Sequence, residues 1–203
     1  VGMSVGGENT NTDNYQLPTS VTATANIDKA ELTITAVTNT KTYDGTLTAA
    51  ATPTYSGLQV GDALTSLAQS YTDKNAGANK TLIVTGYTLY DGNSGQNYTV
   101  KLIDNTTGVI EQKALTLAPT AANKIYDGTI TATVTGYGLT GLVGDETVQI
   151  ESAGAEFSDK NAALNKTVTI SGISISDGTN GGMAANYSVA GTATATAAIS
   201  KAE

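Results

Sequence analysis

One ordered set of short motifs occurs twice in this chain, at nearly constant spacing. The two copies of Lys-x-Tyr-Asp-Gly-Thr begin at Lys41 and Lys124, those of Asp-Lys-Asn-Ala at Asp73 and Asp159, and those of Asn-Lys-Thr at Asn79 and Asn165. Motifs that recur in one order with a fixed period indicate a tandem array of structural units. The chain is therefore expected to fold as repeated modules and not as one large domain.

The period divides the chain into residues 31–113, called unit one here, and residues 114–203, called unit two. Residues 1–30 align only with the back part of a unit, because they contain Asn-Tyr and a final Lys-Ala but no Tyr-Asp-Gly. We therefore expect them to be the C-terminal part of a preceding repeat. Units of this size can bury a modest core without a metal or a disulfide.

Apolar and polar residues alternate through both units, which is typical of β-strands with one buried face. Leu32, Ile34 and Ala36 share one parity and are expected to face a core. No helical period is evident. The sequence predicts an all-β fold of small two-layer modules, either Ig-like sandwiches or β-grasp-like sheets. No Pro/Gly/Ser-rich linker separates the units, so we expect them to lie end to end as a fairly stiff rod.

Several residues are expected to shape turns and strand irregularities. Asp-Gly between alternating runs favours a hairpin with a type I′ turn, which needs positive φ at both central residues. The apolar parity switches once within each unit beside a glycine, which predicts a β-bulge. The alternating run that ends unit two either splits at Gly191 or continues toward a following unit. The turn and bulge residues predicted in this way are Gly45, Gly128, Gly86, Gly172, Asn97 and Asn186.

The composition argues against several kinds of site. The chain has no Cys and no His, which excludes disulfides, Cys/His zinc sites and His-based catalytic triads. Its net charge is −8 and its basic residues do not cluster, so nucleic acid and anionic membranes are not expected partners. No apolar run approaches the ~20 residues of a membrane-spanning helix. We expect no enzymatic activity, no cofactor, no metal site and no insertion into a membrane.

Each Tyr-Asp-Gly copy pairs an aromatic ring with a carboxylate, a combination that carbohydrate-binding platforms use. The candidate glycan-binding residues are Tyr43, Asp44, Tyr126 and Asp127. The simpler interpretation is a turn with a half-buried Tyr, since turn chemistry accounts for all three residues of the motif.

Two polar segments also have a chemical and a structural interpretation. Asp73-Lys74-Asn75 and its copy could supply an internal Lys–Asn cross-link, but an Asx-turn with solvated charges is the simpler expectation. The segment 91–97 has closely spaced oxygen ligands, yet it lacks the twelve-residue calcium pattern with its closing Glu. A turn-forming loop is the better interpretation there.

The motif set resembles the YDG repeat, and the related MBG repeats, of large bacterial surface adhesins. The matching parts are Lys-x-Tyr-Asp-Gly-Thr, Gly-Asp, Asp-Lys-Asn-Ala-x-x-Asn-Lys, the glycine at the parity switch, Asn-Tyr and the terminal Lys-Ala. They cover essentially all of residues 31–203, and the second copy differs in the turn at 161–164. The resemblance implies stalk or presentation modules, as in filamentous-haemagglutinin-like and biofilm-matrix adhesins, and it carries no enzymatic motif.

From these features we expect a structural stalk or spacer of a secreted bacterial adhesin or extracellular matrix fibre, located at the cell surface. Neighbouring repeats of the same protein are the expected partners. One alternative is a module that binds glycan or a matrix polymer such as extracellular polysaccharide. Another is a fibre subunit that assembles with other copies of itself by head-to-tail strand addition through residues 1–30.

Overall fold

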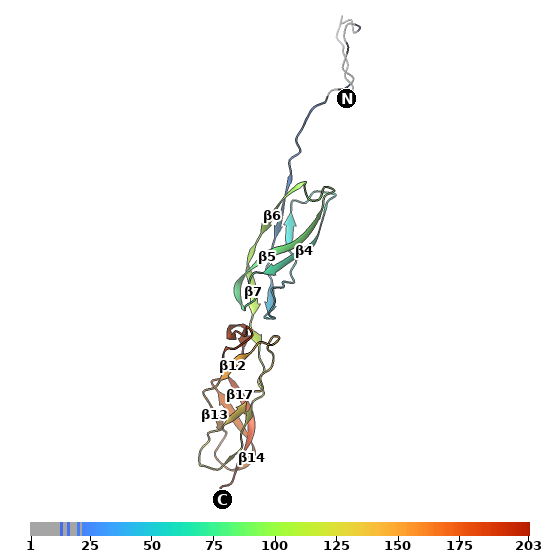
Figure 1. The fold of residues 1–203 in the computed structure, drawn as a ribbon. Helices are drawn as coiled ribbons and strands as arrows, with labels where there is room; N and C mark the ends of the chain where they lie inside the picture. The colour runs from blue at the N-terminus through green and yellow to red at the C-terminus, as the bar shows by residue number, and fades with distance from the viewer. Residues whose placement is uncertain (1–12, 14–15, 17–19, 21) are drawn as a thin grey trace.

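A computed structural model describes Asp13, Gln16, Ser20 and residues 22–203 of the chain. The two units lie end to end along one long axis (Figure 1), and the described residues are almost entirely strands, turns and extended segments. The predicted all-β tandem architecture is confirmed. In the described part of the chain, no helix has the length and hydrophobicity needed to cross a membrane.

Unit one is a sandwich of two sheets. Its strands are β1 (Ala30–Thr35), β2 (Thr40–Thr42), β3 (Thr54–Ser56), β4 (Ala63–Tyr71), β5 (Gly77–Tyr90), β6 (Tyr98–Ile103) and β7 (Asn105–Glu111). One sheet has the order β3-β1-β6 and the other β2-β7-β5-β4. Leu32 and Ile34 of β1 are fully buried and pack with Tyr98 against Leu64 and Leu89 of the facing sheet. Of the two predicted forms this is the sandwich, because no described residue of unit one forms the helix that a β-grasp requires.

Unit two is built from shorter strands. They are β8 (Lys113–Ala114), β9 (Thr120–Ala121), β10 (Lys124–Ile125), β11 (Val134–Gly136), β12 (Val148–Glu151), β13 (Gly154–Phe157), β14 (Ala163–Ser171), β15 (Ser174–Asp177), β16 (Tyr187–Ser188) and β17 (Thr192–Ser200), with one 3-10 turn, η2 (Ala184–Asn186). The main sheet has the order β10-β17-β14-β13. The terminal alternating run is split into β16 and β17 around Gly191, as one of the two alternatives predicted. Val168, Ile170 and Ile199 are buried in the core of this unit.

The Asp-Gly turns differ from the type I′ hairpins predicted. Gly45 has φ +78° and Gly128 has φ +80°, but the Asp before each glycine does not adopt positive φ. Strand β2 also pairs in parallel with the distant β7 and not with a strand after the turn. The turn is closed by side chains instead: one oxygen of Asp44 accepts hydrogen bonds from the Thr46 N–H (2.9 Å) and from Lys41 Nζ (2.8 Å). The second copy repeats these contacts.

The glycines at the two parity switches have different environments. In unit one the register of β4 and β5 shifts at Gly86, where Ala68 pairs with Gly86 and the next residue, Gln69, pairs with Val84. In unit two Gly172 has φ +63° and lies between β14 and β15, which pair with different strands. The expected bulge in one continuous strand is therefore a strand break in unit two. The break lets Ile173 return to the core.

The described residues before β1 contribute no strand to unit one. Residues 22–29 are exposed, and the Ile27 side chain is 97% accessible. Most of the segment 1–30, and with it the prediction that it is a preceding half-repeat able to add strands, lies outside the described residues.

Candidate functional site

The most elaborate cluster of side chains lies where the two units meet. Strand β7 ends at Glu111 and β8, which crosses into unit two, begins at Lys113, so only Gln112 lies between the two strands. One buried cluster also crosses the junction, with Tyr43, Tyr71 and Ile110 from unit one and Leu115 and Tyr187 from unit two. The two units thus share a core in addition to their covalent connection.

A buried carboxylate, that of Glu146, organises this junction. Glu146 follows a tight turn in which its N–H donates to the Val143 carbonyl (3.0 Å), and it is 8% exposed. Oε1 accepts a hydrogen bond from the Tyr43 hydroxyl of unit one (2.8 Å), and Oε2 accepts one from the Tyr187 hydroxyl of its own unit (2.7 Å). Lys74 Nζ lies 3.8 Å from Oε1. A charge can be buried in this way because both of its oxygens are paired.

The two tyrosines also contact each other. Their rings meet edge to face, with centroids 5.5 Å apart and planes at 82°, a favoured aromatic geometry. Burial, followed by the hydrogen bond to Glu146, raises the pKa of Tyr187 to about 12. The same two causes raise the pKa of Tyr43 well above its ordinary value. Both hydroxyls therefore stay protonated donors throughout the neutral range.

Asn186 makes the second polar connection between the units. It is fully buried at the end of η2, and its Oδ1 accepts a hydrogen bond from the Ala76 N–H of unit one (2.8 Å). Its Nδ2 donates to Asn75 Oδ1 (3.1 Å). Asn75 is held in place by an Asx-turn, because its N–H donates to Asp73 Oδ1 (3.0 Å). The Asp-Lys-Asn turn of one unit therefore binds the Asn-Tyr pair of the next.

The four candidate glycan-binding residues fall into different surroundings. Tyr43 is 1% exposed, so neither face of its ring is open to a sugar. The carboxylate of Asp44 already accepts hydrogen bonds from Lys41 Nζ and the Thr46 N–H. Tyr126 is 39% exposed at the far end of unit two. Hydrogen bonds from Lys124 and from the Thr129 N–H lower the pKa of Asp127 to about 2. The structure does not bring the two Tyr-Asp pairs together.

The other polar segments serve as turns. Lys80 pairs with Asp73, and Lys166 pairs with Asp159 at 2.6 Å, so each acid binds a lysine in an ion pair. Asp91 closes its loop by accepting hydrogen bonds from the N–H groups of Asn93, Gly95 and Asn97, at 2.8–3.0 Å. In the described part of the chain, no three Asp, Glu, His or Cys side chains gather as metal ligands would.

Unit one carries the same acid–tyrosine arrangement at its own N-terminal end. The Tyr98 hydroxyl donates to Asp62 Oδ2 and accepts the Gln59 N–H (2.8 Å), just as Tyr187 accepts the Val143 N–H (3.0 Å). Asp62 therefore occupies the position of Glu146. Sequence reasoning missed Glu146 because the repeated Gly-Asp motif aligns Asp62 with Asp145. The stretch between the Gly-Leu pair and this motif is one residue shorter in unit two, so the structural equivalent of Asp62 is the residue after Asp145. Aligning the loops on the Gly-Leu pair before that motif would have found it.

Fold and junction together define a tandem all-β repeat whose units are joined by tertiary contacts as well as by the chain. The model of the YDG domain matches residues 28–108 and 111–197, so the chain belongs to the YDG domain family. A search of curated proteins gave no match. A search of solved structures gave none either.

Proposed function

We propose that the two units are stalk or spacer repeats of a secreted bacterial adhesin or extracellular matrix fibre, and that they hold other parts of the protein away from the cell surface. The observation that carries the proposal is the junction around Glu146 and Asn186. A spacer must keep its length under thermal motion, and a shared core with hydrogen-bonded polar groups resists bending better than a flexible linker. The resemblance of the motifs to adhesin repeats supports the extracellular setting.

Two side-chain contacts and the chain connection restrain the angle between the units. The Tyr43–Glu146 hydrogen bond and the contact of Ala76 with Asn186 tie different loops of unit one to unit two. The direct strand connection across Gln112 supplies a third attachment. Three separated attachments restrain bending in more than one direction, whereas a single connection acts as a hinge.

The distribution of distances between two spin labels tests the proposal. The chain has no Cys, so Thr99→Cys and Thr169→Cys place one label on an exposed strand position of each unit. The unmodified junction is expected to give one narrow distance peak, and Asn186→Ala combined with Glu146→Ala a broader one. Asp104→Ala, at an exposed residue away from the junction, is the matched control. A broad distribution in the unmodified junction would contradict the spacer function.

The glycan-binding alternative has narrower support, since only Tyr126 of the two motif tyrosines has an open ring. Saturable binding of a polysaccharide fragment that is lost in Tyr126→Ala would favour that alternative over a pure spacer.

A further inference from the structure

The C-terminal end of unit two presents a second copy of the residues that unit one inserts into the junction. Tyr126 is 39% exposed, whereas its copy Tyr43 is 1% exposed. Asn161 and Ala162 are likewise exposed, while the equivalent residues of unit one are half-buried against Asn186. This set, Tyr126 with Asn161 and Ala162, is called the knob below. Nothing among the described residues covers it.

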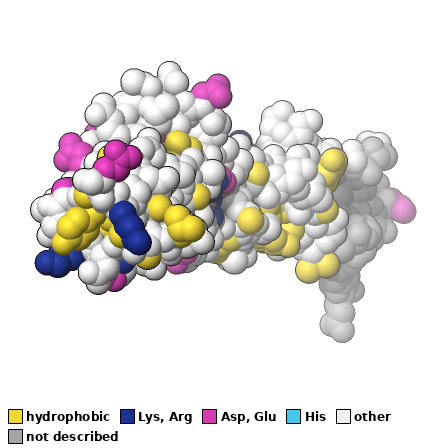
Figure 2. All heavy atoms as spheres, turned by 90° about the horizontal axis from the view of Figure 1, so that it is seen from below, with side chains coloured by type: hydrophobic (Ala, Val, Ile, Leu, Met, Phe, Trp, Pro, Cys, Tyr) yellow, Lys and Arg dark blue, Asp and Glu magenta, His cyan; other side chains and the backbone are white. Residues whose placement is uncertain are grey.

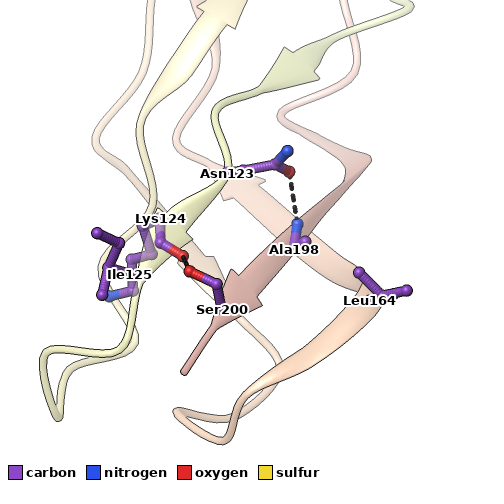
Figure 3. Close-up of a pocket in the computed structure, with 6 residues that line it drawn as sticks. All are labelled: Asn123, Lys124, Ile125, Leu164, Ala198 and Ser200. Carbon is purple, nitrogen blue, oxygen red and sulfur yellow. Dashed lines mark hydrogen bonds between the residues drawn. The ribbon is translucent and has the colours of Figure 1, made fainter. Parts of the chain in front are cut away.

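The knob is surrounded by apolar side chains that unit one lacks. Ile125 and Leu164 are 65% and 80% exposed, and the corresponding residues of unit one are Thr42 and Ala78. Both line a hollow of about 430 Å³ at this end (Figure 3). Figure 2 views the molecule from this end and shows hydrophobic side chains beside lysines. An apolar patch with charged neighbours is typical of a protein contact surface.

The N-terminal end of unit one carries a partial copy of the junction's acceptor side. A pocket of about 340 Å³ lies there, called the socket below. It is lined by Gln59, Asp62 and Tyr98, the counterparts of Val143, Glu146 and Tyr187, together with Ile27, Asp28, Ala30 and Asn97. Asn97 is the counterpart of Asn186, but its side chain is already hydrogen-bonded within its own loop, to Asn93 and to the Asp91 carbonyl. In the junction, the Tyr43 hydroxyl reaches the acid at the equivalent place. Tyr98 uses one oxygen of Asp62, and no described group donates to Oδ1.

We propose that the knob of one chain docks into the socket of a second copy of this chain. Tyr126 then donates to Asp62 Oδ1, and Lys160 approaches that acid as Lys74 approaches Glu146. The occupant is a second copy because one chain carries both halves of a contact that it already makes internally. Such a contact is head-to-tail and does not close, so it produces linear assemblies of increasing length.

Docking requires residues 22–29 of the second copy to move. In the internal junction, the end of β7 enters unit two at the corresponding place, and Ile27 and Asp28 line one wall of the socket. Residues 22–29 form no strand, so moving them breaks no sheet pairing of the described residues. The contact is small and has no covalent tether, so it is expected to be weak and visible only at high protein concentration. The spacer function does not depend on it.

A complementation experiment with the full chain tests this proposal. In sedimentation velocity, the unmodified protein is expected to form dimers and longer species as its concentration rises. Tyr126→Ala removes the knob and Asp62→Ala the socket, so each variant alone is expected to remain monomeric. In an equimolar mixture, the Tyr126→Ala chain keeps an intact socket and the Asp62→Ala chain keeps an intact knob. One chain of each kind can therefore pair, and the mixture is expected to give dimers and nothing larger. Tyr55→Ala, at another exposed tyrosine, is the control and should associate like the unmodified chain.

Three results would overturn the proposal: an unmodified chain that stays monomeric at millimolar concentration, single variants that assemble like the unmodified chain, or a mixture that forms no dimer. Thermal unfolding shows whether Asp62→Ala folds; if it does not, Asp62→Asn keeps an acceptor for Tyr98 and is expected to weaken association about tenfold. Deleting residues 1–28 separates docking from strand addition. Docking predicts equal or stronger association after the deletion, and loss of association would contradict it.

Discussion

The hydroxyl of Tyr43 in unit one donates a 2.8 Å hydrogen bond to Glu146 in unit two, 103 positions further along the chain. The tyrosine belongs to the motif by which the repeat is recognised, yet its partner belongs to the next repeat. The motif residue is therefore buried partly by its own unit and partly by its neighbour, which supplies the acceptor for its hydroxyl. The second copy, Tyr126, keeps the same turn contacts, but its side chain is 39% exposed because no described unit packs on it.

Replacing Glu146 by Ala is expected to destabilise the junction by about 2–4 kcal/mol, because two buried tyrosine hydroxyls lose their charged acceptor. Denaturant unfolding should then separate into two transitions, as the units lose their coupling. Glu156→Ala removes an exposed acid in the sheet of unit two and serves as the control. A single transition at the original midpoint in Glu146→Ala would show that this carboxylate does not couple the units.

Stability is expected to fall at high pH. The pKa of Tyr187 is raised from 10.0 to about 12, so the folded protein holds this proton more tightly than the unfolded chain. The stabilisation is complete below pH 10 and is lost as the pH rises through 12, with a slope of about 1.4 kcal/mol per pH unit for one group. Unfolding measured at several alkaline pH values should show this slope. Tyr187→Phe should reduce it, and an unchanged slope in that variant would assign the effect to other groups.

Gly172→Val should destabilise unit two by about 1–3 kcal/mol. Gly172 has φ +63°, and a Cβ on it would lie 2.5 Å from the Cβ of Ala153. Gly154 has neither constraint: its φ is not in the left-handed region and no atom lies within 4 Å of a Cβ built there. Gly154→Val is therefore the matched control and should change the melting temperature little. Equal effects of the two substitutions would mean that the strand break does not depend on glycine.

Replacing Asp91 by Ala should loosen the loop before β6, because three N–H groups lose their acceptor. These backbone hydrogen bonds hold the pKa of Asp91 below its ordinary value of 3.8, although partial burial acts in the opposite direction. The loop should therefore be fully held above pH 3.8 and loosen as the pH falls below it. Hydrogen exchange of the Asn93, Gly95 and Asn97 amides reports this directly. Protection that is unchanged in Asp91→Ala would contradict the capping role.

Much of the fold follows from local pattern alone. The alternation that includes Leu32 and Ile34, and that of Val168 and Ile170, predicts their buried faces, since successive strand residues point to opposite sides of a sheet. The split of the terminal run at Gly191 is one of the two predicted alternatives, and the duplication by itself predicts two units in tandem. All of these features depend on the spacing of residues close together in the sequence.

Strand partners and the junction were decided by the tertiary structure. Strand β2 pairs with β7, more than sixty residues away, so the hairpin expected after Tyr43 does not form. The acid that accepts the Tyr43 hydrogen bond is determined by how unit two packs against unit one. Because the loop before the Gly-Asp motif is one residue shorter in unit two, the acceptor is Glu146 and not the aspartate of that motif. Local periodicity determines which face of a strand is buried. The groups that cover that face come from distant parts of the chain, and only packing of the whole molecule brings them together.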